Sequence, residues 1–254
     1  SQLRLTPLAS IEPSLEAANV LRSLGGWNAM RGRWKQASES YLLLTQANRV
    51  SSPERISANY DLVAPGPALA ENGNMADFAK FREWVIDRFG ETTNAGIASQ
   101  VVQATLLLPA DADFIQRLEP VKMVIVGGAL EAKRPIATTS LGVWRTWSMA
   151  LLEYRRGDFE KSVSWGRRAL EYKEPSPVIS AIIHPVLAMA HSRAGHADVA
   201  RSELEKSREL IQIAFAPDLP AVYEPRGRGQ GYWWDWLLAR ILFREAEAIV
   251  EKQS

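Results

Sequence analysis

Cysteine is absent from this chain of 254 residues, and histidine occurs only three times. The chain therefore has no disulfide, no thiolate metal ligand and no cysteine nucleophile. His184 and His191 are seven residues apart, so on one helix they would lie about 10 Å from each other, too far to share one metal ion directly. We expect hydrogen-bonded or solvated roles for these two residues and for His196, with no metal site and no cofactor.

Recognised catalytic motifs are missing as well. The sequence contains no H-E-x-x-H, G-x-S-x-G or P-loop pattern. The β-branched run 121–128 ends in two glycines but lacks the G-x-G-x-x-G spacing of a nucleotide loop, so it predicts a buried helix. Asp111 and Asp113 lie between Pro109 and a helix start, where helix capping explains them better than paired acid–base chemistry. The sequence thus predicts a protein that is not an enzyme.

An excess of charge and long apolar runs are also lacking. Lys plus Arg number 30 against 29 for Asp plus Glu, a balance that predicts no strong attraction to nucleic acid or anionic lipid. The short motif Arg226-Gly-Arg228 is therefore interpreted as a solvated loop. No stretch approaches 18 apolar residues and no leader pattern opens the chain, so we expect a cytoplasmic protein without a membrane partner. The first residue is Ser1 instead of Met, and we interpret the sequence as part of a larger protein.

Four similar turns recur along the chain. Each combines a glycine, a polar residue and an apolar residue with a small or aromatic residue further on, and each lies between segments of helical apolar spacing. Glycine ends a helix readily because it accepts the left-handed conformation. The turns are centred on Gly32, Gly73, Gly157 and Gly195. Successive turns are about 40 residues apart, except that the interval from Gly73 to Gly157 is about twice as long. A fifth turn is therefore expected between these two, at 109–114, with Pro and Asp in place of glycine.

This period predicts an all-α fold, a right-handed α-solenoid of about five helical hairpins plus a C-terminal capping helix. The expected parts are an extended lead-in (1–13), helical repeats (14–215), a loop (216–231) and the capping helix (232–254). That last helix is expected to turn one apolar face inward and one charged face outward. Pro65 and Pro67 predict a kink or break in the second hairpin, and Pro185 a kink or a late helix start in the fifth.

The unit from Trp147 to Leu170 resembles a tetratricopeptide repeat. It has a small residue early in its first helix, an aromatic residue before the turn, a Gly-Asp-aromatic turn at 157–159 and an Ala-Leu pair at its end. Related signals surround Gly195 and Gly32. The chain departs from the family in its longer period and in Ser162 and Gly166, which replace usual packing residues.

Segments 88–94, 105–109 and 234–246 further resemble the repeat tails of large bacterial signalling proteins, where such repeats follow a Ser/Thr kinase domain or a WD-repeat propeller. The resemblance covers residues 14–252. It implies a scaffold that presents a concave groove to a peptide or to a neighbouring domain of the same polypeptide. The basic, Asn-rich clamp for a C-terminal carboxylate is not evident, so a ligand of that kind is not predicted.

An aromatic stripe supplies the candidate binding residues. The resemblance implies that the first helix of each hairpin lines the groove, and rigid aromatics beside an arginine are residue types that anchor peptides. The candidates are Trp144, Trp147, Leu151, Tyr154, Arg155, Ile182, Met189 and Arg193. The alternative is that these rings pack against the preceding hairpin or against the final helix folding back.

Three hypotheses for function follow. The first is a non-enzymatic scaffold that binds a protein or peptide within a bacterial signalling protein. The second is a structural spacer or self-association module with an occluded groove, which light scattering would distinguish by a concentration-dependent dimer. The third, an enzyme with a novel helical site, requires a deep pocket that holds ionisable residues with shifted pKa values.

Overall fold

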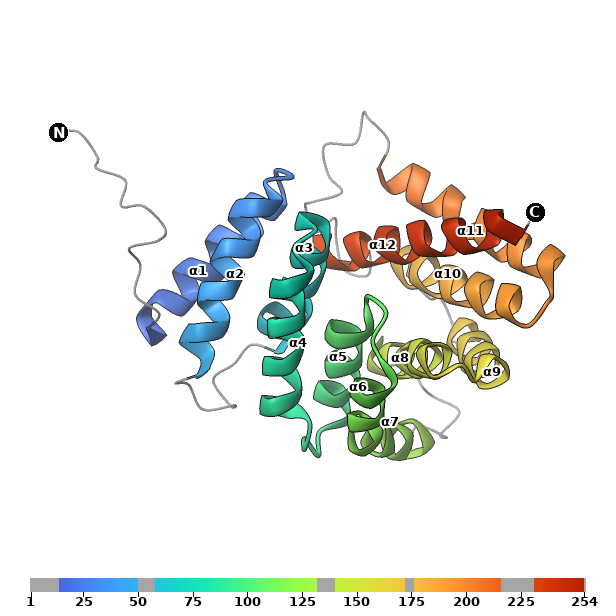
Figure 1. Cartoon of the computed structure of the whole chain (residues 1–254), viewed down its shortest axis with the longest axis horizontal. Coiled ribbons are helices and arrows are strands. Elements are labelled where there is room, and N and C mark those ends of the chain that lie inside the picture. Colours follow the sequence, from blue (N-terminus) through green and yellow to red (C-terminus); the bar gives the residue numbers. More distant parts are fainter. Residues whose placement is uncertain (1–13, 50–57, 132–139, 172–175, 216–230, 254) are drawn as a thin grey trace.

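The computed structural model describes residues 14–49, 58–131, 140–171, 176–215 and 231–253. Helices are the only regular elements in these ranges (Figure 1). The predicted lead-in and nearly all of the predicted loop, including its Arg-Gly-Arg motif, lie outside the described residues. The all-α prediction is confirmed for the described residues, and none of their helices is both long and apolar enough to cross a membrane.

The elements in chain order are α1 (Leu15–Ala29), α2 (Trp34–Arg49), a π-helical turn η3 (Ala58–Val63), α3 (Pro65–Asn72), α4 (Met75–Phe89), α5 (Ala95–Leu106), α6 (Ala112–Arg117), α7 (Glu119–Glu131), α8 (Ser140–Arg156), α9 (Phe159–Leu170), α10 (Pro177–Arg193), α11 (Ala197–Ala214), α12 (Trp233–Val250) and a short 3₁₀ turn η4 (Glu251–Gln253).

The four predicted glycine turns are confirmed. Each glycine has a positive φ, from 67° at Gly32 to 85° at Gly157. At the turn between α8 and α9, the Gly157 amide donates to Tyr154 O at 3.0 Å and the Asp158 amide to Glu153 O at 3.0 Å. These bonds satisfy the last carbonyls of α8, as in a Schellman-type ending. The Asp158 carboxylate then accepts from the Lys161 amide at 3.1 Å and starts α9.

The expected fifth turn also lies where the spacing placed it. After α5, the Asp111 carboxylate accepts from the Phe114 amide at 2.8 Å and caps α6, as predicted. The second half of this hairpin is divided in two helices, because α6 ends at Arg117 and α7 begins at Glu119. Pro120 explains the division, since it has no N–H to donate to Gln116 and disfavours a continuous helix.

The prolines act differently in the two hairpins. A break at Pro65 and Pro67 is confirmed, because α3 begins at Pro65 after the η3 turn. A late start at Pro185 is not found, since α10 runs unbroken from Pro177 to Arg193. Pro185 cannot donate to the carbonyl of Ala181. That carbonyl instead accepts from the buried Ser207 hydroxyl of α11 at 3.0 Å, which offsets the missing helical bond.

The two residues that depart from the tetratricopeptide pattern have structural roles. The Ser162 hydroxyl of α9 donates to Ala150 O of α8 at 2.8 Å and is fully buried. A Cβ at Gly166 would lie 2.7 Å from a methyl carbon of Leu187. The glycine therefore lets α9 approach α10 closely.

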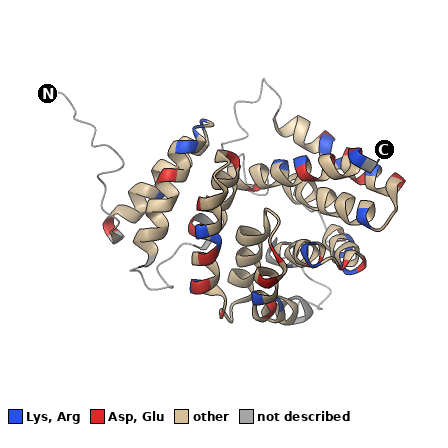
Figure 2. Ribbon diagram, viewed as in Figure 1, with Lys and Arg blue, Asp and Glu red and all other residues tan. Residues whose placement is uncertain are grey.

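Most helices that follow one another in the chain contact each other, from α1 on α2 through to α10 on α11, while α5 packs on α7 rather than on α6 (Figure 1). The central helix α5 contacts η3, α4, α7 and α8 and carries no charged residue, as Figure 2 shows. α12 departs from a simple order: it packs on α10 and α11, and it also contacts α3 near the other end of the chain. At its start, the Trp233 ring stacks on Tyr41 of α2 with centroids 6.4 Å apart.

The predicted split of α12 into an apolar and a charged face holds only in part. Neighbouring residues all round its first half are buried: Trp233, Trp234, Asp235, Leu237, Leu238, Ala239, Ile241, Leu242 and Phe243. A helix that is enclosed on all sides belongs to the interior of a fold. Two arginines of α12 form ion pairs with another helix, because Arg240 and Arg244 both reach Glu71 of α3.

Candidate functional site

Most of the predicted groove residues lie in the interior. Trp147 and Leu151 of α8 are fully buried, and Tyr154 is nearly so. Ile182 and Met189 of α10 are also fully buried. The side of α8 that was assigned to a groove therefore packs within the array, where α8 meets α5, α9 and α10. Their positions match the alternative stated from the sequence, in which the rings fill the interior.

The remaining candidates differ from one another. Trp144 is half-buried, with its ring 6.2 Å from that of Trp147. Arg193, at the end of α10, is exposed and hydrogen-bonds the Tyr154 side chain. The Arg155 side chain is only 4% exposed. The structure thus brings Tyr154, Arg155 and Arg193 together, next to a partner that the sequence did not reveal, Glu245 of α12.

Arg155 uses its guanidinium to join three parts of the chain. Nε donates to Leu106 O at 3.0 Å and Nη2 to Leu107 O at 2.9 Å, both at the end of α5. Nη2 also donates to Glu245 Oε2 at 2.7 Å, and Nη1 pairs with Glu245 Oε1. A bidentate pair of this kind has fixed geometry as well as strength. Arg155 therefore fixes α12 against the end of α5.

A second arginine, Arg82 of α4, reaches the same end of α5. Its Nε donates to Thr105 O at 2.8 Å, and its Nη2 to Leu108 O at 2.9 Å and Pro109 O at 3.1 Å. Burial, together with the nearby charge of Arg155, lowers the pKa of Arg82 to about 10. Cations at a helix C-terminus are favoured by the exposed carbonyls there. Two arginines thus replace the hydrogen bonds that Pro109 prevents the helix from making.

Another buried ion pair joins η3 to α1, the first of the described helices. Asp61 of η3 is fully buried. It accepts from Arg22 Nε at 2.6 Å and Nη2 at 2.8 Å, and from Asn48 Nδ2 at 3.1 Å. Burial, followed by the negative charge of Asp61, raises the pKa of Tyr41. A buried charge of this kind requires its partners, so the cluster ties α1 and α2 to η3.

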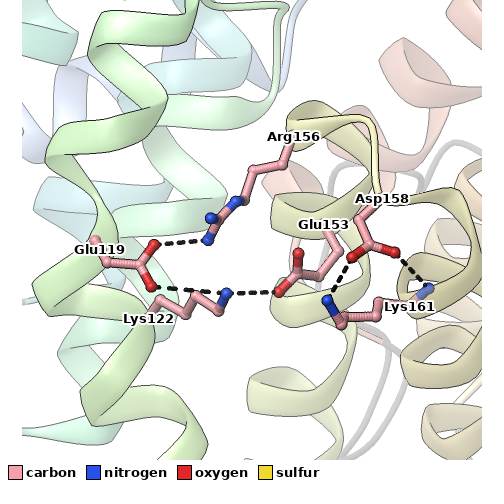
Figure 3. Close-up of polar contacts among 6 residues, drawn as sticks. All are labelled: Glu119, Lys122, Glu153, Arg156, Asp158 and Lys161. Atoms are coloured by element: carbon pink, nitrogen blue, oxygen red, sulfur yellow. Dashed lines mark hydrogen bonds and ion pairs between the residues drawn. The ribbon is translucent and has the colours of Figure 1, made fainter.

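An ion-pair chain crosses the outer side of α7 and α8 (Figure 3). Arg156 Nη1 lies 2.6 Å from Glu119 Oε2, and Lys122 Nζ lies 3.0 Å from the buried Glu153 carboxylate. Asp158 and Lys161 form a separate pair at the start of α9. The neighbouring residues Arg155 and Arg156 therefore differ: Arg155 lies inside, and Arg156 forms an ion pair between helices.

The histidines form hydrogen bonds and no metal cluster. His184 Nδ1 lies 2.6 Å from Glu203 Oε2. Burial raises the pKa of Glu203, but hydrogen bonds from His184 and Lys206 outweigh it and bring the pKa to about 2. His191 and His196 face each other with Nδ1 atoms 3.5 Å apart. Within the described residues, no group of three or more His, Asp or Glu side chains is arranged to hold a metal ion.

Sequence reasoning missed four residues of the two buried clusters. These are Arg82 and Glu245 near the end of α5, and Asp61 and Arg22 between η3 and α1. A weak signal existed for Asp61, a single charge beside the apolar run Leu62-Val63-Ala64. Comparison with protein-family models found no match, and comparison with curated proteins found none either. The interpretation of the site therefore depends on its geometry.

Proposed function

We propose that this chain is a non-enzymatic, tetratricopeptide-like module of a larger bacterial signalling protein, a right-handed helical solenoid that serves as a structural and self-association unit. Its inner face is occupied by its own C-terminal helix. Contacts with other proteins, or with a neighbouring domain of the same polypeptide, are then made by its outer surfaces.

The observation that carries this proposal is the burial of the predicted groove residues by other helices of the chain: α5, α9 and α10 pack around α8, and α12 packs on α10. A peptide that used Trp147, Leu151 and Met189 would have to displace side chains already packed there. Full burial of one large apolar side chain is worth roughly 1.5–3 kcal/mol. Exposing all three would therefore cost a large part of the 5–15 kcal/mol or so by which a typical protein is stable.

The exposed apolar side chains lie elsewhere. Among the described residues they include Val20 and Trp27 of α1, Met123 of α7 and Ile213 of α11. Exposed aromatic and aliphatic side chains that gather on one face indicate protein contacts more often than scattered ones do. Val20 and Trp27 share α1, whereas Met123 and Ile213 stand on two other helices, so α1 is the outer surface that favours association.

Light scattering on the purified chain, over two orders of magnitude in concentration, tests the proposal. We expect the mean mass to rise from monomer toward dimer as concentration increases. A peptide array probed with the same protein should show no saturable binding. A strictly monomeric chain that binds a peptide, and loses it on Trp144→Ala with its stability intact, would contradict the proposal and favour the peptide scaffold.

A further inference from the structure

α1 lies at one edge of the helical array and presents an unusual outer face. Its main neighbour is α2, and its one basic residue, Arg22, turns inward to Asp61. On the opposite side, Val20 is 52% and Trp27 51% exposed. Leu24 between them is half-buried. Apolar residues thus occupy a surface from which charge is nearly absent.

Four residues follow one another along this face of α1, namely Glu16, Val20, Leu24 and Trp27, and Arg31 follows them in the turn after the helix. We call these five residues the α1 stripe. Steps of three and four residues keep side chains on one side of a helix, and an apolar series with this spacing is typical of helix-to-helix seams. The outer faces of α4, α9 and α11 instead carry several charged residues each. The α1 stripe is therefore built for contact with another helix.

The α1 stripe is complementary to itself. An acidic residue, Glu16, stands at one end and a basic residue, Arg31, at the other, and both are exposed. Val20 and Trp27 lie at matching distances from the middle, at Ser23 and Leu24. If two such helices pair in antiparallel orientation, Glu16 of each copy meets Arg31 of the other, and Val20 meets Trp27. A two-fold dimer requires this kind of self-complementary surface.

Trp27 is already held in place for such a contact. The guanidinium carbon of Arg31 lies 3.2 Å from the centroid of the Trp27 ring. Cation–π stacking restricts both side chains before any partner arrives. Tryptophan and arginine are also the residue types that contribute most often to the centre of protein interfaces.

We propose that the α1 stripe is a homodimer contact, through which two copies of the chain pair in antiparallel orientation about a two-fold axis near Ser23 and Leu24. This inference rests on the self-association proposed above and assigns it to one surface. One helix from each copy buries less than the about 1,200 Å² of a standard interface. The dimer is therefore weak and reversible.

Charge exchange across the pair tests both the surface and its orientation. Sedimentation equilibrium would compare the dimer dissociation constant of the wild type with Glu16→Arg, Arg31→Glu and the double variant. Each single change puts like charges together twice in the dimer, so we expect a rise of about tenfold. The double variant restores both pairs and should return to within about threefold of the wild type.

Apolar variants with matched controls complete the experiment. Trp27→Glu and Val20→Glu should each abolish measurable dimer, whereas Ile213→Glu and Met123→Glu, at positions of similar exposure, should leave the dissociation constant unchanged. Far-UV circular dichroism checks that each variant folds. Because Trp27 and Val20 are half-exposed, folding does not depend on them in the way that it does on a core residue.

The outcomes separate this inference from the proposed function. A wild-type dimer that is unaffected by the α1 variants would overturn the inference and leave self-association standing on another surface. Charge exchange that fails to restore the dimer would overturn the antiparallel pairing. A wild type that is monomeric at every concentration would overturn the inference and self-association together, and would leave the α1 stripe to another occupant, such as a helix of a neighbouring domain.

Discussion

At the scale of single residues, a few buried polar groups hold distant parts of the chain together. Arg155 and Glu245 are separated by 90 residues in the sequence yet form a bidentate pair. Arg155 follows an aromatic stripe, and that context favoured a role in ligand binding. Nothing in the local spacing indicates a carboxylate on α12, because charged residues are usually exposed. The role of Arg155 depends on tertiary structure that one sequence does not reveal.

Loss of the Arg155 guanidinium should destabilise the chain strongly. Arg155→Ala leaves Glu245 without its cation and two carbonyls of α5 without donors, so we expect the free energy of unfolding to fall by about 3–5 kcal/mol. Urea denaturation would measure this change in the free energy of unfolding. Arg201→Ala, at an arginine 51% exposed on α11, is the matched control and should change stability by no more than about 0.5 kcal/mol. Equal effects of the two variants would show that Arg155 has no structural role.

The buried carboxyl of Asp235 should make the stability of the fold decrease as pH rises, the reverse of the usual effect of an aspartate. Burial raises its pKa to about 7 from 3.8, against the lowering effect of the Tyr232 amide. Between these values the folded chain holds a proton that the unfolded chain has lost. The contribution of Asp235 to stability is therefore largest at low pH and declines as pH rises from about 4 to about 7, by roughly 1 kcal/mol per pH unit.

The Asp235→Asn variant isolates this effect. Asparagine keeps an acceptor for the Tyr232 amide but does not titrate. The difference in unfolding free energy between wild type and variant should therefore shift in favour of the variant as pH rises through this window. A difference that stays constant from pH 4 to pH 7 would show that Asp235 is ionised in the folded chain at the lower end of that range.

At the scale of elements, turn chemistry was the most predictable part of the structure. The glycine turns, the Asp111 and Asp158 caps and the break before α3 follow from local preferences that a sequence displays directly. The uninterrupted course of α10 through Pro185 contradicts the late helix start, which was one of the two expectations stated for that proline. It depends on a hydroxyl from the next helix, Ser207, and such a long-range partner is invisible to a local rule.

A pair of glycine variants tests the turn geometry. Gly157 has φ +85° and Gly127 lies within α7, and a Cβ added at either would meet nothing within 4 Å. Only backbone conformation therefore distinguishes them. We expect Gly157→Ala to lower stability by about 1 kcal/mol and Gly127→Ala to raise it by up to about 1 kcal/mol. Thermal unfolding measures both, and effects of the same sign would contradict the assigned turn.

A double-mutant cycle tests the substitute bond in α10. Ser207→Ala leaves the buried Ala181 carbonyl without a donor and should cost about 1–3 kcal/mol. In a Pro185→Ala background, the new amide at position 185 donates to that carbonyl, and the same change at Ser207 should cost much less. Additive effects of the two substitutions would show that the hydroxyl does not replace the proline's missing bond.

At the scale of the whole molecule, the repeat pattern did not predict where α12 packs. Helical hairpins with about a 40-residue period predicted an array with an open inner side. α12 packs on α10 and α11 and contacts α3, and ion pairs of Glu71, Glu245 and Arg208 join it to α3, α8 and α11. Periodicity describes neighbours in the chain, and it gives no information on where a final helix returns. From the sequence, the return of the final helix onto the hairpins was therefore stated only as an alternative.

Hydrogen exchange measured by mass spectrometry on the wild-type chain tests this account most directly. If α12 is part of the interior, its amides open only with the whole fold, and they should exchange as slowly as the slowest amides of α8 and α10. If amides across Trp233–Val250 exchange orders of magnitude faster while α8 and α10 stay protected, α12 is a detachable cover, and the inner face is available to a ligand after all.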